Sequence, residues 1–96
     1  DKEILTLAGF KIQVIETPGH TRGGVCYYLP EEGVLFSGDT LFRASVGRTD
    51  FPTGSMSQIV RSVRYLTENL PGDTIVYPGH QETTTIAYEA RFNPYL

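Results

Sequence analysis

Short apolar runs separated by turn-forming residues predict a β-sheet in the first 40 residues of the chain. Runs at residues 4–7, 11–15, 25–29 and 34–36 have the length and composition of strands. The second run alternates apolar and polar side chains, which is typical of a strand with one face against a core. The fourth run has no polar residue, so we expect it to be buried on both faces.

A helical pattern follows a long connection. Residues 40–54 are interrupted by glycines and a proline, and loops of this length in small domains are often functional. Ser55 and Gln58 have the spacing of a capping box, which predicts that a helix begins there. An apolar stripe follows along this helix, formed by Ile59, Val63, Leu66 and Leu70.

The last part of the chain predicts one more strand and one more helix. The strand covers residues 74–77, and the helix covers residues 83–91 with Thr83 or Thr84 as its cap. The element order is therefore β-β-β-β-loop-α-β-α, an α/β (α+β) fold with helices on one face of a sheet. A length of 96 residues suits a single domain that covers residues 1–96.

The composition excludes several classes of protein. The chain is 40% hydrophobic and 20% charged, as in globular domains, and its net charge of −3 comes without a cluster of Lys and Arg that would bind nucleic acid. It has no apolar run of the roughly 18 residues that a membrane span needs, and its first residues lack the apolar region of a signal peptide. The single cysteine, Cys26, lies in a strand-like run, where a buried hydrophobe is favoured over a reactive thiol. A reducing cytoplasm fits this cysteine content.

Three residues with metal-binding side chains follow predicted strands. The two histidines, His20 and His80, both end a Pro-Gly-His tripeptide, and Asp39 follows the run at 34–36 through Ser and Gly. Strand ends lie about 5 Å apart in a sheet, so these side chains could converge on one point. A single His or a Gly-Asp pair after a strand is commonly an ordinary loop residue. The repeated tripeptide with an aspartate between its copies favours a metal site.

The donor types indicate which metal and which chemistry. Imidazole nitrogens and a carboxylate oxygen suit zinc, iron or manganese. Such a metal lowers the pKa of a bound water to about 7 and so supplies a hydroxide nucleophile at neutral pH. Asp39 is the carboxylate placed to bridge two ions, which are about 3.5–4 Å apart in dinuclear sites. We therefore take Asp39 as a catalytic residue as well as a metal ligand.

The sequence around these residues resembles a known family. The motifs Thr-Pro-Gly-His-Thr-Arg-Gly-Gly at 17–24, Phe-Ser-Gly-Asp-Thr-Leu-Phe at 36–42 and Tyr-Pro-Gly-His at 77–80 are similar to the later motifs of the metallo-β-lactamase-fold hydrolases. The glyoxalase-II-like (hydroxyacylglutathione hydrolase-like) branch is the most similar. The segments at 47–50 and 91–96 resemble that branch too.

The resemblance implies a fold, a cofactor and an activity. The family has an αββα sandwich of two similar halves with two zinc ions at one edge, and this chain would be the C-terminal half. His20 would bind one ion, His80 the other, and Asp39 would bridge them. The reaction implied is hydrolysis of a small-molecule thioester by a metal-bound hydroxide.

One departure from the family limits this implication. The family opens with a His-x-His-x-Asp-His run that supplies most of its ligands, and this sequence has no counterpart of it. We therefore expect the chain to be a fragment of a longer hydrolase, inactive alone, with partial or no metal occupancy. Its expected partner is the missing N-terminal half of the domain or a second copy of itself.

Two further residues are candidates for contact with substrate or with the metal ligands. Arg48 could orient a substrate carboxylate, although an Arg–carboxylate contact with Asp50 that only holds the loop is the favoured interpretation. Thr21 follows His20 and could hydrogen-bond near the ligand, although a structural role is favoured for it.

Two other functions stay open. The segment at 47–51 also resembles the iron-dependent persulfide dioxygenases of the same superfamily. A non-catalytic half-domain that associates with itself is the third alternative, because an uncovered sheet face tends to find another chain.

Overall fold

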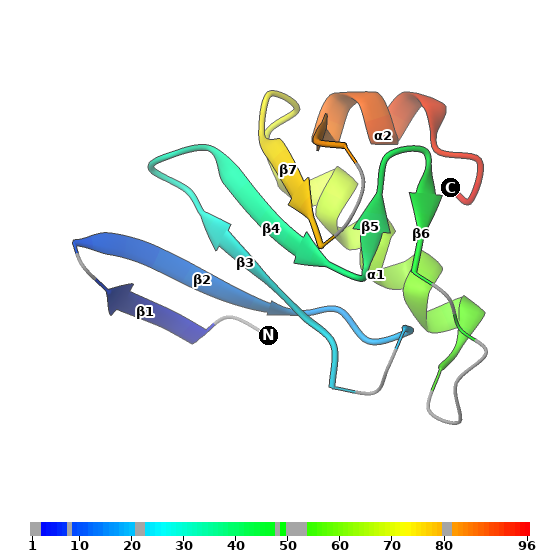
Figure 1. The fold of residues 1–96 in the computed structure, drawn as a ribbon, viewed down its shortest axis with the longest axis horizontal. Coiled ribbons are helices and arrows are strands. Elements are labelled where there is room, and N and C mark those ends of the chain that lie inside the picture. The colour runs from blue at the N-terminus through cyan, green and yellow to red at the C-terminus, as the bar shows by residue number, and fades with distance from the viewer. Residues whose placement is uncertain (1–2, 8, 21–22, 48, 50–53, 80–81) are drawn as a thin grey trace.

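A mixed sheet carries the two helices of the structure. The computed structural model describes residues 3–7, 9–20, 23–47, 49, 54–79 and 82–96. Its strands are β1 (Glu3–Leu7), β2 (Phe10–Glu16), β3 (Val25–Leu29), β4 (Val34–Gly38), β5 (Leu41–Phe42), β6 (Ser45–Val46), β7 (Ile75–Pro78) and β8 (Thr84–Thr85). The helices are α1 (Met56–Asn69) and α2 (Ile86–Phe92). This arrangement confirms the predicted α/β class (Figure 1).

The topology directs three strands toward the same edge of the sheet. The six-stranded sheet has the order β1-β2-β3-β4-β7-β8, and β5 pairs with β6 in a separate hairpin. Both β2 and β4 run antiparallel to β3, while β7 runs parallel to β4. It follows that β2, β4 and β7 run in the same direction, so their C-terminal ends lie along the same side of the sheet. We call this side the C-terminal edge of these strands.

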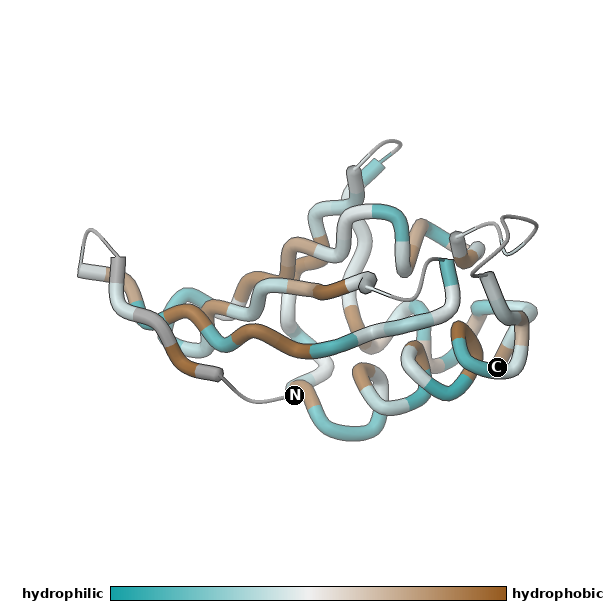
Figure 2. Tube along the Cα trace, turned by 90° about the horizontal axis from the view of Figure 1, so that it is seen from below, coloured by the Kyte–Doolittle hydropathy of each residue, from teal (hydrophilic) through white to brown (hydrophobic). Residues whose placement is uncertain are grey.

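Helix α1 begins and packs as its sequence predicts. The Ser55 side chain accepts a hydrogen bond from the Gln58 backbone N–H at 3.3 Å, which satisfies one donor of the first turn. The apolar stripe turns inward, and the core consists of Ile15, Cys26, Tyr28, Leu35, Leu41, Val46, Ile59, Val63, Leu66, Val76 and Ile86. The core therefore lies between α1, α2 and one face of the sheet, and Figure 2 shows helical turns on one side of the strands. Neither helix of the described chain has the length and apolarity to span a bilayer.

The opposite face of the sheet is apolar and open. Val14, Tyr27, Phe36 and Tyr77 are successive partners across β2, β3, β4 and β7 and form one row. Tyr27 and Phe36 are each 44% exposed and Tyr77 is 41% exposed. The rings of Phe36 and Tyr77 stack with their centroids 5.6 Å apart. We call these four residues the open-face row.

Phe36 shows that one expectation was wrong. We expected residues 34–36 to be buried on both faces, whereas only Leu35 is buried fully and Phe36 points to the open face. The apolar composition of β4 reflects two apolar surfaces, of which the helices cover one.

Two short elements also differ from the sequence expectations. Residues 40–54 were expected to form a loop, but β5 and β6 form a hairpin inside it. The last helix begins at Ile86 with Thr85 as its cap, because residues 84–85 pair with β7 as β8. Strands of two residues leave no periodic signal in a sequence.

Candidate metal site

The loops that follow β2, β4 and β7 meet at one edge of the sheet. His20 lies in the loop after β2, Asp39 follows β4 directly, and Gly79 follows β7. The Gly79 N–H donates to the Gly38 carbonyl at 2.8 Å, so the segments that follow β4 and β7 are hydrogen-bonded to each other. A β-carbon placed on Gly79 would lie 3.4 Å from Asp39 Oδ1, so this backbone passes beside the Asp39 carboxylate.

The His20 loop is fastened to the first turns of α1. The Ser55 N–H donates to the Gly19 carbonyl at 2.7 Å, and the Ser62 hydroxyl donates to the Pro18 carbonyl at 2.7 Å. Gly19 has a φ of +141°, and a β-carbon at this position would overlap the backbone of Ile59. A glycine is therefore needed for the loop to lie directly on the helix.

A buried polar network on the core side joins the His20 loop to the turn that carries Asp39. Thr17, completely buried, hydrogen-bonds Thr40 between their hydroxyl oxygens at 3.1 Å and contacts Cys26 Sγ at 3.4 Å. Burial raises the pKa of the Cys26 thiol, and the hydrogen bonds with Thr17 and Thr40 oppose this shift without cancelling it. The expected structural role of Cys26 is consistent with this burial, since a protonated thiol is a poor nucleophile and a poor metal ligand.

The structure brings His20 and Asp39 together. His20 Nε2 lies 3.7 Å from Asp39 Oδ2, with the two side chains 20% and 44% exposed. Two donors on one zinc ion, each about 2.0–2.2 Å from it in tetrahedral geometry, lie roughly 3.3–3.5 Å apart. The observed separation is close to that value, so this pair fits as part of a metal site and stays open to solvent on one side.

The remaining predicted site residues cannot be placed against this pair. His80, Thr21 and Arg48 lie outside the described residues. Among the residues that the structure does describe, no group of three or more His, Cys, Asp or Glu side chains is close enough to hold an ion. The described part of the site is therefore the His20–Asp39 pair and the backbone around it.

The sequence interpretation missed the residues that support the pair. Thr17, Thr40 and Ser62 hold the two loops, yet hydroxyl residues at loop ends look like ordinary turn formers. Thr17 and Thr40 lie within the two motifs, and this was the one signal available for them.

Comparison with known proteins places the chain in a family. The Metallo-beta-lactamase superfamily matches residues 2–80. A hydroxyacylglutathione hydrolase, GloC of Haemophilus influenzae, is 43% identical over 94 residues, which cover 98% of this chain and 44% of that protein. The chain belongs to the metallo-β-lactamase superfamily and lies in its glyoxalase-II-like branch. It spans less than half the length of the curated relatives that it matches first.

Solved structures agree with this placement. The BLEG-1 B3 metallo-beta-lactamase has a TM-score of 0.92 at 43% identity, over 99% of this chain and 46% of that one. ETHE1 from Myxococcus xanthus has a TM-score of 0.89 at 38% identity, over 97% of this chain and 42% of that one. TTHA1623, solved in a di-iron-bound form, has a TM-score of 0.86 at 44% identity, over 96% of this chain and 45% of that one. One of these three structures thus holds two iron ions, and each match covers nearly the whole of this chain.

Proposed function

We propose that this chain carries the C-terminal share of the metal site of a thioester hydrolase similar to glyoxalase II. His20, Asp39 and His80 would hold the metal ions, with Asp39 shared between two of them, and Arg48 and Thr21 would lie near the substrate. The observation that carries the proposal is the 3.7 Å approach of His20 Nε2 to Asp39 Oδ2 at the edge where three strands end. The similarity to a hydroxyacylglutathione hydrolase supports a thioester as the substrate class.

The residues of this chain would position the reaction and the metal would supply its reactivity. When bound, zinc polarises a carbonyl and lowers the pKa of a water molecule to about 7. The loops on either side of the His20–Asp39 pair are fixed from the core side by Thr17, Thr40 and Ser62. Preorganised ligands of this kind need little rearrangement when the ion binds. The buried thiol of Cys26 is consistent with a reducing, cytoplasmic setting.

Zinc binding by single variants tests the ligand assignment. His20→Ala and Asp39→Ala should each weaken zinc binding at least about tenfold, as expected when one ligand of an ion is lost. Asp73→Ala is the matched control, because Asp73 is an exposed aspartate in the turn after α1. Titration of the chain with zinc against a chelator gives the affinities. Equal affinities for all three variants and the wild type would contradict the assignment.

The open-face row defines the partner that we propose for this chain. The row is apolar and aromatic, and packed sheets bury such faces against each other about 10 Å apart. We propose that the second sheet of the domain, supplied by the N-terminal half, covers it. More than half of the length of the relatives lies outside the match, which leaves room for such a sheet.

Light scattering of the chain alone and with a separately expressed N-terminal half tests this partner. A one-to-one complex that Phe36→Lys abolishes is the expected result. A homodimer of the chain that the N-terminal half does not dissociate would assign the face to a second copy instead. A chain that stays monomeric in both samples would contradict a protein partner for this face.

Iron is the alternative metal, and an iron-dependent oxidoreductase is the alternative function. The di-iron-bound form of TTHA1623 favours testing iron on this fold. The metal content of the purified protein, together with oxygen consumption, distinguishes the two functions. Iron with oxygen-dependent turnover would replace the hydrolase proposal.

A further inference from the structure

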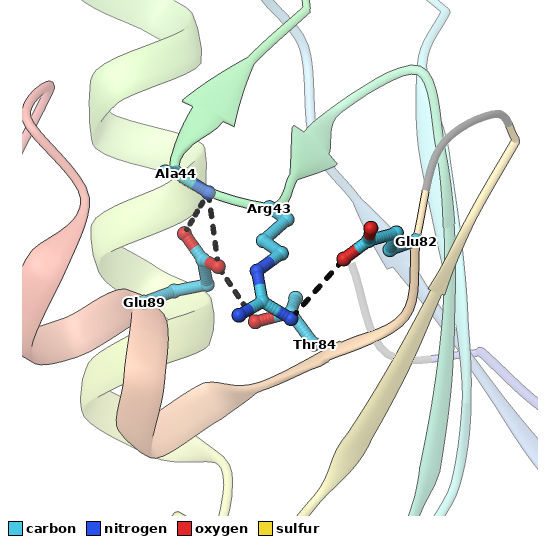
Figure 3. A network of polar contacts seen from close by, with 5 residues as sticks. All are labelled: Arg43, Ala44, Glu82, Thr84 and Glu89. Carbon is cyan, nitrogen blue, oxygen red and sulfur yellow. Dashed lines mark hydrogen bonds and ion pairs between the residues drawn. The ribbon is translucent and has the colours of Figure 1, made fainter.

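A buried carboxylate lies away from the strand ends that carry the proposed ligands. Glu89, in α2, is 0% exposed, an unusual position for an ionisable side chain. Figure 3 shows its carboxylate pointing at the turn between β5 and β6. A carboxylate with no exposure is tolerated only where hydrogen-bond donors surround it.

Donors from three segments satisfy the Glu89 carboxylate. The Ala44 backbone N–H donates to Oε1 at 3.0 Å and to Oε2 at 3.1 Å. The Thr84 hydroxyl donates to Oε2 at 2.7 Å, and the Asn93 amide donates to Oε1 at 2.8 Å. Both carboxylate oxygens therefore accept two hydrogen bonds each, Oε1 from Ala44 and Asn93 and Oε2 from Ala44 and Thr84.

The carboxylate fixes a turn that has an uncommon backbone conformation. Ala44 has a φ of +57°, the left-handed region that residues other than glycine rarely adopt. The amide of Asn93, the C-cap of α2, also donates to the Ser45 carbonyl at 3.1 Å, so α2 and its cap hold the turn at two successive residues. The hydrogen bonds that the Ala44 N–H donates to the buried Glu89 carboxylate offset the strain of the left-handed Ala44.

The hairpin that Glu89 holds returns the chain to the metal site. Its first strand follows Asp39 and Thr40, and its second strand ends immediately before Gly47. The Gly47 N–H donates to the Thr40 carbonyl at 3.0 Å. A β-carbon on Gly47 would overlap the Asp39 carbonyl oxygen and lie 3.1 Å from the His20 β-carbon. Gly47 thus packs against both residues of the His20–Asp39 pair.

We propose that Glu89 is a positioning residue for the metal site and acts through the β5–β6 hairpin. By fixing the turn at Ala44, it sets where Gly47 lies and so restrains the backbone that carries Asp39 and faces His20. The proposal rests on the proposed function for the statement that this pair binds metal. The restraint on Gly47 itself can be measured without metal.

An exposed acid close to the same hairpin provides the matched control. Glu82 pairs with Arg43 at 3.4 Å, and their side chains are 78% and 47% exposed (Figure 3). Arg43 also lies over the Tyr88 ring, 4.8 Å from its centroid. Exposed ion pairs contribute little to stability, so Glu82→Ala should leave the hairpin as it is.

Amide hydrogen exchange of the metal-free chain tests the restraint. Glu89→Ala should speed exchange at Ala44 and Gly47 at least about tenfold while the amides of β3 and β4 keep their rates. Glu89→Gln should stay within about threefold of the wild type, because its amide oxygen still accepts from Ala44 and its NH2 can donate to Thr84. Val63→Ala, a truncation in the core, should not speed exchange at Gly47 more than at the amides of β3 and β4.

Zinc titration of the same variants then links the hairpin to the site. Glu89→Ala should weaken zinc binding at least about tenfold, while Val63→Ala and Glu82→Ala should not weaken it. If Glu89→Ala does not fold, Asn93→Ala takes its place, since it removes a contact to the hairpin and leaves the carboxylate.

The outcomes separate this inference from the proposed function. If Glu89→Ala leaves the exchange rate at Gly47 unchanged, or raises it no more than at the amides of β3 and β4, the positioning role is overturned. If Glu89→Ala speeds exchange selectively at Gly47 but binds zinc with wild-type affinity, the positioning role is overturned too, because the restraint on Gly47 would not affect the proposed ligands. If Glu89→Ala speeds exchange selectively at Gly47 but the wild-type chain binds no zinc even with the N-terminal half present, the proposed function would be contradicted and the restraint would stand.

Discussion

Replacement of Gly19 by alanine tests how the His20 loop is held on α1. Gly19 combines a φ of +141° with a position at which a β-carbon would overlap the backbone of Ile59. Gly33→Ala is the matched control, since Gly33 has a φ of +66° and no atom within 4 Å of an added β-carbon. The two variants therefore share the same new methyl group and differ in whether it meets the helix.

The magnitudes follow from these two contributions. A left-handed alanine costs about 1–2 kcal/mol, which is the whole effect expected for Gly33→Ala. At Gly19 the backbone strain is about 1–3 kcal/mol, and the loop must also move away from the helix. That movement lengthens the hydrogen bond from the Ser55 N–H to the Gly19 carbonyl, now 2.7 Å, and its loss costs about 1 kcal/mol. We expect Gly19→Ala to lower the free energy of unfolding by about 2–4 kcal/mol in total.

Urea and thermal unfolding followed by circular dichroism measure the difference. For a domain of this size, each kcal/mol shifts the midpoint temperature by about 4–8 °C, so a difference of about 1 kcal/mol between the two variants can be measured. Zinc affinity should fall in Gly19→Ala and stay unchanged in Gly33→Ala. If the two variants were equally stable, the loop would not lie against the backbone of α1, and the argument for a preformed His20 position would be wrong.

Two other predictions concern the buried network below the site. Thr17→Val should lower the free energy of unfolding by about 1–3 kcal/mol, because it removes the hydrogen bond with the buried Thr40 hydroxyl, and thermal unfolding checks this. The Thr17→Val, Thr40→Val double variant should lose less stability than the sum of the two single losses, because the two hydroxyls interact; additive losses would contradict this coupling. The Cys26 thiol keeps its proton in the folded state above its ordinary pKa of 9.0, so the folded state binds more protons than the unfolded state there and stability should fall as the pH rises above 9.0. The slope of unfolding free energy against pH in that range should be shallower for Cys26→Ala; identical slopes would show that the thiol is not desolvated.

The strands and helices were predictable wherever a periodic pattern was long enough. The run at 25–29 became β3 at those bounds, and Ser55 caps α1 as its spacing with Gln58 indicates. Local sequence decides these elements because alternation, helical spacing and capping each act over a few residues.

Features that depend on distant partners could not be predicted in the same way. The left-handed Ala44 has no sequence signal, because its conformation is fixed by Glu89, which is 45 residues away. Phe36 belongs to an apolar strand, and no local pattern reports that only one of its faces is covered. For the site, the repeated Pro-Gly-His and the intervening Asp39 identified the candidates, while the contact between His20 and Asp39 required the sheet topology.

The parallel pairing of β4 with β7 has a consequence for the order in which the molecule folds. The antiparallel strands β1 to β4 can form by local hairpin closure, whereas β7 can join only after the intervening hairpin and α1 have crossed over the sheet. Asp39 lies at the start of this crossover and Gly79 at its end. We therefore expect the end of the sheet that carries the His20–Asp39 pair to be completed late in folding, and a chain that loses β7 by local unfolding would lose the proposed metal site while its first four strands were still intact.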